Sequence, residues 1–506
     1  MTKTHLISLC VILLFLTACT AEPPKQKNSS QQSGPKGAAA KLTVEEYDAL
    51  SAEQQYQVSN KLMATFFKGV PASEFFDFTA GIDTLEVSGG VDYVKAVESA
   101  LGKKLENPSA YLARVADRNN FTETRQTTAE SIAIIREYPL SKNMFEAWMA
   151  YTLANTILFS PAEEIDSADF IDAQRVYAKL VDRMAAGEGM RDIVYKHMVS
   201  QENWRRFRSP EDNTREMIEI YLGLFDRDAD VPLAALACKN WYLTGENEGY
   251  ELVVALDENT EPQRVLDTWV TTCFDFYRTV ADHPLLIPRV ITVLVDHFFP
   301  EDSSTLRAEL VQSIANTNPT TFHEIFKAIV LSKEYLINNE RPMSLEEAFF
   351  NVADRIRWKP WASFYNSLTN PSMSSNFPTL HLLKQPNMSL KLGRFSAQPL
   401  DSLSFAYYHQ LVRQYLLLDL KSSAFNVNDG GWSPQLMEEG DFLIEDEYLQ
   451  YLFISVLGRK ANQTELDALN AVIVERGYEE NRLGQTMLVF DYMSRLPEVY
   501  YLQAVQ

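Results

Sequence analysis

The stretch Thr321-Phe-His-Glu-Ile-Phe-Lys-Ala-Ile-Val330 indicates how this chain folds. Thr321 can cap the free backbone amides of a helix, and Glu324, three residues later, completes a capping box. The apolar residues recur at the spacing of an α-helix and form one stripe along its face. They are Phe322, Ile325, Phe326, Ile329 and Val330. The stretch therefore predicts an amphipathic helix that packs against a hydrophobic core.

Similar start signals recur along the chain and predict a mainly α fold. They are Thr43-Val-Glu-Glu46, Ser160-Pro-Ala-Glu163, Ser209-Pro-Glu-Asp212 and Asn462-Gln-Thr-Glu465. We expect the first of these helices to run to about Phe67, and Gly458 to end the helix before Asn462. Alternating strand patterns longer than a few residues are hard to find.

Two irregular stretches interrupt the predicted helices. Residues 359–400 are crowded with Asn, Pro and Ser, and a loop of that length is uncommon without a role, so we expect a covering flap or a connector. Residues 426–434 form a second turn-rich joint. We expect a large multi-helix body in two lobes, a main helical domain at 41–358 and a C-terminal helical lobe at 401–506. No internal repeat of fixed period is visible.

The N-terminal residues predict secretion. Lys3 precedes an apolar run that ends at Ala18, which is the layout of a secretory signal and is too short for a membrane-spanning helix. The run ends in Leu16-Thr-Ala-Cys19, which resembles the lipobox of bacterial lipoproteins. The resemblance implies that residues 1–18 are removed and that Cys19 carries diacylglycerol on its thiol and an acyl chain on its new amino group. An ordinary signal peptide that contains a cysteine is the alternative.

The residues after the lipobox predict a lipid anchor and a tether. Residues 19–40 are rich in Pro, Lys, Gln, Ser, Gly and Ala and offer little to bury, a composition typical of disordered linkers. Each buried lipid CH₂ contributes about 0.8 kcal/mol, so several acyl chains hold a protein stably on a membrane. The lipoprotein resemblance also implies an outer-membrane location in a Gram-negative host, because Thr20 and not Asp follows Cys19.

The charge of the chain excludes a general nucleic-acid-binding role. The sequence holds 68 aspartates and glutamates against 46 lysines and arginines, a net charge of -22. An acidic surface repels nucleic-acid phosphates and anionic lipid headgroups. We therefore expect contact with a membrane through the lipid, a possible secreted or envelope protein partner, and no nucleic acid.

Two of the four cysteines remain available to the folded part. Cys10 leaves with the signal and Cys19 takes the lipid, which leaves Cys238 and Cys273. The predicted oxidising compartment permits a disulfide between them. Two separate buried thiols are the alternative, because a free cysteine packs as a small apolar residue.

The most distinctive local segment runs from Trp204 to Glu219, and two interpretations of it are open. Its charged residues include Arg205, Arg208, Arg215, Glu216 and Glu219. Three arginines just before a helix N-terminus, which itself attracts anions, could form a pocket for an anionic ligand. Alternatively the charges form an ion-pair network that fixes a corner between two helices, with Arg215 and Glu219 on one helix face. We favour the structural interpretation.

The same segment resembles the hallmark Asn-Glu-Asn-(Phe/Tyr)-Ala-Arg-Glu-x-x-Glu-Leu of a bacterial family of secreted proteins of unknown function. The residues that fit this hallmark and its continuation are Glu211, Arg215, Glu216, Glu219, Asp230, Val231, Ala234, Ala235 and Trp241. The residues that depart from it are Pro210, Asn213, Thr214, Gly223 and Asn240. The resemblance spans roughly residues 144–357 and implies a fold class more than an activity. Family members often accompany a secreted partner that resembles sulfatases, which implies a partner role.

No metal site or cofactor is predicted apart from the lipid on Cys19. No two histidines have the His-Glu-x-x-His spacing, and His283 and His297, each preceded by an aspartate, could ligate a metal only if the fold assembled them. Residues 226–230 imitate an EF-hand loop, but Val231 occupies its glycine position. We expect an acidic turn there, with Asp230 capping the next helix. Neither a Gly-x-Ser-x-Gly motif nor a phosphate-binding glycine loop occurs.

These features predict a lipid-anchored cell-envelope protein that binds or scaffolds a secreted or envelope partner. The alternative is an envelope or extracellular hydrolase with a site around Arg215 and Glu216. A deep pocket that gathers these two side chains with a histidine would favour the hydrolase.

Replacing the predicted lipid-bearing cysteine tests the anchor. Cys19→Ala should release the protein from the membrane or leave its signal uncleaved, because the thiol that accepts the lipid is gone. Cys10→Ala is the control and should mature normally, since Cys10 is removed with the signal. Membrane fractionation and mass spectrometry of the N-terminus measure both effects. Unchanged maturation and membrane association of Cys19→Ala would refute lipidation.

Overall fold

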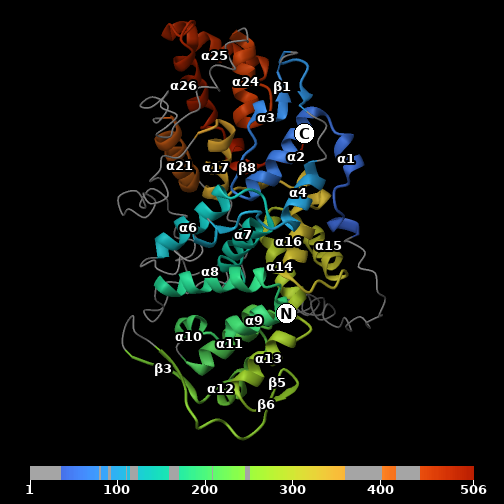
Figure 1. The fold of residues 1–506 in the computed structure, drawn as a ribbon, viewed down its shortest axis with the longest axis vertical. Helices are drawn as coiled ribbons and strands as arrows, with labels where there is room; N and C mark the ends of the chain where they lie inside the picture. Colours follow the sequence, from blue (N-terminus) through green and yellow to red (C-terminus); the bar gives the residue numbers. More distant parts are fainter. Residues whose placement is uncertain are drawn as a thin grey trace, which may run out of the picture. The chain divides into compact units, whose positions relative to one another are not determined.

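Helices make up most of the chain in the computed structural model, which confirms the mainly α prediction (Figure 1). The structure describes residues 36–78, 81–88, 93–109, 111–113, 124–158, 170–207, 209–245, 251–358, 402–417 and 445–505. Several predicted features lie outside these residues, namely Cys19, the start signal 160–163, Arg208 and the irregular stretches 359–400 and 426–434. Within the described ranges, no helix is both long enough and apolar enough to cross a bilayer.

The stripe predicted from residues 321–330 is confirmed in α16 (Phe322–Val330). Thr321 and Glu324 form both halves of the capping box, and all five apolar residues of the stripe are buried. The predicted starts at Ser209, before α11 (Pro210–Leu222), and at Asn462, before α25 (Gln463–Arg476), are also confirmed. Gly458 ends α24 (Glu445–Leu457) with a positive φ of 73°. Local capping chemistry therefore places these helix ends.

The first predicted helix is wrong in its length, because a second capping box divides it. α1 (Val44–Asp48) ends early, and Ser51 and Gln54 exchange side-chain and backbone hydrogen bonds to start α2 (Ala52–Thr65). The break lets the Tyr47 hydroxyl reach Ser59 Oγ at 2.9 Å inside the core.

The folded body also begins before the predicted boundary at Lys41. The short 3₁₀ helix η2 (Gly37–Ala39) packs on α15 (Ser304–Ala315), and Ala39 is buried. The backbone amide of Ala39 donates to Ser313 Oγ, whose hydroxyl donates to the carbonyl of Lys36. These contacts order residues that composition alone assigned to the tether.

Helix α7 (Lys142–Ala154) is enclosed by other elements. Every residue from Met144 to Ala154 is buried, so the helix has no solvent face and no amphipathic pattern. Trp148 packs against Phe145, Phe66 just after α2 and Phe326 of α16. Other helices that contact α7 are α4 (Tyr93–Gly102), α6 (Thr124–Glu137) and α8 (Phe170–Ala185). These neighbours cover α7 from several sides.

The middle of the chain continues as helices that lead into two β-hairpins. In order, these elements are α9 (Met190–Met198), α10 (Gln201–Arg206), η4 (Asp228–Asp230), α12 (Val231–Ala237), β3 (Trp241–Thr244), β4 (Glu251–Val254), β5 (Gln263–Val265), β6 (Thr268–Val270), α13 (Cys273–Asp282) and α14 (Leu286–Phe298). β3 pairs with β4 and β5 with β6, both antiparallel. Cys238 and Cys273 form a disulfide that joins the end of α12 to the start of α13, which is one of the two alternatives that the sequence left open. Alternating strand patterns did not reveal these hairpins, because each strand is only three or four residues long.

The C-terminal helices pack on elements that lie far earlier in the chain. α24 contacts α3 (Ala72–Phe75) and α17 (Leu345–Arg355), as Figure 1 shows. The remaining elements here are β1 (Phe76–Asp77), β2 (Glu86–Val87), η6 (Glu334–Asn338), β7 (Arg341–Pro342), α21 (Ser402–Leu411), η8 (Val412–Leu417), α26 (Arg482–Met493), η10 (Pro497–Tyr500) and β8 (Tyr501–Leu502). Buried residues on both sides of the predicted lobe boundary belong to one hydrophobic core.

A buried ion pair holds the C-terminal strand to the middle of the chain. Arg341 on β7 is 2% exposed, and its guanidinium donates to both carboxylate oxygens of Glu347 at 2.6 and 2.9 Å. It also donates to the Tyr335 hydroxyl at 3.0 Å. β7 pairs in turn with β8, with Arg341 opposite Leu502. The pair therefore joins α17, β7 and the last strand.

Breaking this pair should destabilise the protein strongly. Arg341→Met leaves the Glu347 carboxylate buried without its partner, and we expect a loss of about 3–5 kcal/mol in the free energy of unfolding. Urea unfolding followed by circular dichroism measures it. Lys333→Met is the control, because its ion pair with Glu46 is exposed and should contribute no more than about 1 kcal/mol. Equal losses in the two variants would contradict the prediction.

Candidate functional site

The charged residues of the predicted network do not lie together: Arg205 is in the core and Arg215 is on the surface. Arg205 on α10 is buried, and its Nη1 donates to Oδ1 of Asp172, which is fully buried on α8, at 2.7 Å. This pair links two helices, because each partner stands on a different one. The charge of Arg205 is therefore paired inside the protein, with Asp172.

Arg215 faces the surface. Its side chain is 37% exposed, and Nη1 lies 2.5 Å from Oδ1 of Asp228 and 3.5 Å from Oε1 of Glu219. Glu216, the next residue, is buried on the inner side of α11 and has interaction partners of its own. Arg215 and Glu216 thus point in different directions. Arg215 pairs with Glu219 on its own helix and with Asp228 in η4.

The histidine and aspartate candidates are engaged with other groups. His283 Nδ1 accepts from the backbone amide of Leu285 at 3.2 Å, and the ring of His297 packs against Phe298 with ring centroids 4.9 Å apart. Asp282 lies 3.8 Å from Arg278, and Asp296 lies 3.5 Å from Arg307. Among the described residues, no group of three His, Cys, Asp or Glu side chains has the geometry of a metal site.

The predicted capping role of Asp230 is wrong. Its side chain makes no cap hydrogen bond at the start of α12. Its Oδ2 instead accepts from Arg227 Nε at 2.8 Å and from the backbone amide of Leu266 at 3.3 Å. Leu266 stands in the β5–β6 turn with a positive φ of 50°, so Asp230 ties this turn to the start of α12. The Asp230 carboxylate therefore binds Arg227 and the amide of Leu266, and not the free backbone amides at the start of α12.

The hairpin region, defined here as residues 225–285, is held by contacts with α10 and α11 and by an internal disulfide. Trp241 at the start of β3 is buried against Trp204, Phe274 and Tyr277, with ring centroids 4.8 to 5.8 Å apart. The Tyr277 hydroxyl donates to Asn213 Oδ1 on α11 at 2.6 Å. The disulfide closes a loop of 35 residues, and a closed loop of this size stabilises a fold by about 4 kcal/mol in the chain-entropy model.

This region carries most of the large apolar side chains that the described part of the chain exposes. Eight of ten lie in it, namely Phe225, Leu236, Tyr242, Val254, Leu256, Trp269, Phe274 and Leu285. Trp269 on β6 is 69% exposed. The other two, Leu112 and Val474, lie on other parts of the chain. Scattered apolar residues are normal on a surface, but their concentration in one region is typical of an interaction site.

Acidic residues accompany these exposed apolar side chains. From Phe225 to Leu285 the sequence holds twelve aspartates and glutamates against four lysines and arginines, a net charge of -8 with histidine neutral. Arg264 on β5 and Asp267 in the turn pair at 3.7 Å and are largely exposed. The hairpin region therefore combines aromatic side chains with negative charge. A signal for it in the sequence was the pair Leu256 and Trp269, both within turn-rich segments that need no core residue.

No family model, curated protein or solved structure matches this chain.

The two arginines that the sequence singled out should differ in their effect on stability. Arg205→Met leaves Asp172 in the core without its 2.7 Å partner, so we expect a loss of about 3 kcal/mol in the free energy of unfolding. Arg215→Met removes only a surface pair and should lose no more than about 1 kcal/mol. Urea unfolding of both variants measures this. A larger loss for Arg215→Met would reverse the assignment.

Proposed function

We propose that this protein is a lipid-anchored cell-envelope protein that binds a secreted or envelope protein partner through its hairpin region. The observation that carries the proposal is the concentration of exposed aromatic and aliphatic side chains on a region fixed by a disulfide. Tryptophan and tyrosine contribute much of the binding energy in protein interfaces, because they bury a large area at little cost in conformational entropy. Trp269 and Tyr242 are the expected anchors.

The charge of the hairpin region selects the chemistry of the partner. A net charge of -8 attracts a basic surface and repels the anionic headgroups of a membrane. We therefore expect a partner protein that presents lysines or arginines around an apolar patch. Electrostatic attraction of this kind mainly accelerates association, while the buried aromatic side chains slow dissociation.

Two further features support an envelope location. The lipobox-like Leu16-Thr-Ala-Cys19 follows a short apolar run, which favours lipidation at Cys19. The disulfide between Cys238 and Cys273 is of a kind that forms and persists in oxidising compartments outside the cytoplasm. Both agree with a protein that meets its partner in the envelope.

Photo-cross-linking in intact cells tests the proposal. A photoreactive phenylalanine analogue in place of Trp269 should cross-link to one protein that has a basic surface. The same analogue in place of Val474, which is also exposed but lies on α25, is the matched control and should give no such product. Trp269→Ser should then weaken binding of the purified partner about tenfold or more, and added salt should slow its association.

Three outcomes would contradict the proposal. A cross-linked dimer of this chain would make the hairpin region a self-association surface. A lipid adduct at position 269 would make it a membrane contact. The same products at positions 269 and 474 would show that the hairpin region has no special role.

A further inference from the structure

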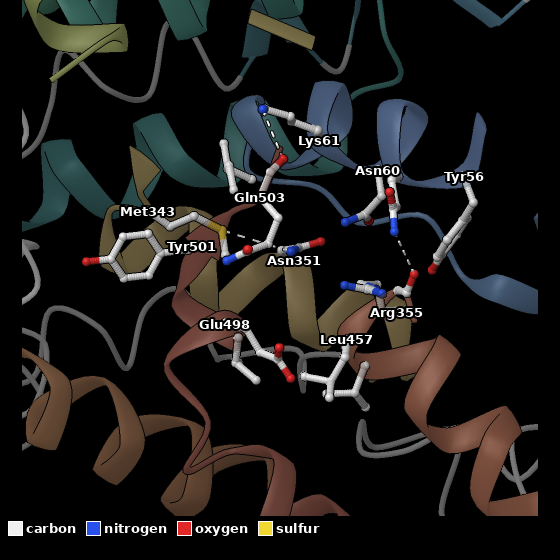
Figure 2. A pocket seen from close by; sticks show the side chains of 15 residues that line it. Tyr56, Asn60, Lys61, Met343, Asn351, Arg355, Leu457, Glu498, Tyr501 and Gln503 are labelled. Atoms are coloured by element: carbon white, nitrogen blue, oxygen red, sulfur yellow. Dashed lines mark hydrogen bonds between the residues drawn. The ribbon is translucent and has the colours of Figure 1, made fainter. Parts of the chain in front are cut away.

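A pocket lies where helices from distant parts of the chain meet the C-terminal segment (Figure 2). Its walls come from α2, from α17, from the end of α24 and from the segment 498–503, which covers part of η10 and all of β8. The pocket holds about 460 Å³ of empty space, part of which is open to solvent. None of the residues that line it belongs to the hairpin region.

Arg355 on α17 is a buried cation without a carboxylate partner. It is 5% exposed, its Nη2 donates to the backbone carbonyl of Ile454 at 3.0 Å, and its Nε makes no hydrogen bond. The guanidinium carbon lies 5.5 Å from the centroid of the Tyr56 ring. Across the described residues, no carboxylate lies within 4.0 Å of it. A buried charge left in this state is costly, and an anion beside it would lower that cost.

Two amide side chains accompany Arg355. Asn351, one turn earlier on α17, is 3% exposed, and its Oδ1 has no hydrogen-bond donor. Asn60 on α2 uses its Oδ1 to accept from the backbone amide of Val70 at 3.1 Å, which leaves its amide nitrogen to donate elsewhere. Figure 2 shows these two amides and the guanidinium of Arg355 turned toward the same space. Around this space the pocket thus offers two hydrogen-bond donors, Arg355 and Asn60, and one acceptor, Asn351.

The other charged groups of the pocket are already satisfied. Lys61 donates from Nζ to the backbone carbonyls of Asn339 and Gln503, and burial lowers its pKa to about 7. Glu498 is held by Arg459, with Oε1 2.6 Å from Nη2. Arg355 is therefore the permanent charge in the pocket that has no opposite charge beside it.

We propose that this pocket binds a small carboxylate that also carries an O–H or N–H donor. The carboxylate would lie against Arg355 and the amide nitrogen of Asn60, and the donor would meet Oδ1 of Asn351. A single unpaired guanidinium balances the one negative charge of a carboxylate. A phosphate dianion carries twice that charge and needs a second cation. Pairing the buried charge and the buried acceptor together gives the site its selectivity, because each would otherwise stay unsatisfied.

Glycolate is the probe for this site, since it joins a carboxylate to one hydroxyl donor. Calorimetric titration of the full protein should show saturable binding of one glycolate per chain. Glycolamide, which has the same shape without the charge, and inorganic phosphate should bind at least tenfold more weakly. Acetate, which lacks the hydroxyl, should bind several-fold more weakly than glycolate.

Two variants separate the site from general effects of charge. Arg355→Met should weaken glycolate binding at least tenfold, whereas the control Arg357→Met should not, because Arg357 donates to Ser73 Oγ at 2.7 Å and does not line the pocket. Asn351→Leu should abolish the preference for glycolate over acetate. If Arg355→Met fails to fold, the comparison of glycolate with glycolamide on the unaltered protein and the Asn351→Leu variant still decide the question.

Several results would overturn the proposal. They are the absence of saturable glycolate binding, equal binding of glycolamide, stronger binding of phosphate, or unchanged glycolate binding by folded Arg355→Met. Each leaves the proposed partner binding of the hairpin region untouched, since the two sites share no residue.

Discussion

The buried pair of Arg341 and Glu347 is the constraint on which the C-terminal half of the structure depends. Glu347 accepts hydrogen bonds from the guanidinium of Arg341 and from the backbone amide of Ser344. The same carboxylate therefore completes the capping box of α17 and neutralises the charge of Arg341 on β7. A buried ion pair is stable only when nearly all its hydrogen-bonding groups are used, and here Tyr335 takes a further donor. This closes α17, β7 and β8 into one unit and fixes where the last residues of the chain lie.

The helix face that carries Glu347 also carries Arg355, a buried cation that has no carboxylate partner among the described residues. Glu347, Asn351 and Arg355 stand four residues apart on α17, so they share a face that is turned into the protein. The carboxylate at the start of this face has its cation, but the guanidinium at its end has no anion among the described residues. Because the pair at Arg341 sets the orientation of α17, it also sets the direction in which Arg355 points. The ion pair at the start of α17 thus positions Arg355 in the pocket at the end of the same helix.

The sequence predicted the parts of this structure that depend on local chemistry. The stripe in residues 322–330 and the cap at Asn462 follow from residues three or four apart, which is why both were correct. The break at Ser51 was missed because two capping boxes in succession look like one long amphipathic pattern. The pocket around Arg355 could not be predicted, because its walls come from segments separated by more than four hundred residues, as Lys61 and Gln503 are. Arg215 attracted attention through its neighbours in the sequence, yet its side chain meets solvent.

The hairpin region shows how the fold supports exposed apolar side chains. A two-stranded hairpin alone is barely stable in water, and here two of them are present without a larger sheet. Trp241 in the core and the disulfide between Cys238 and Cys273 supply the order that the strands lack. Since this order exists before any partner arrives, binding would not have to overcome the entropy of arranging Trp269 and its neighbours. A region that is rigid, acidic and aromatic can therefore bind with an affinity that a flexible segment of the same composition would not reach.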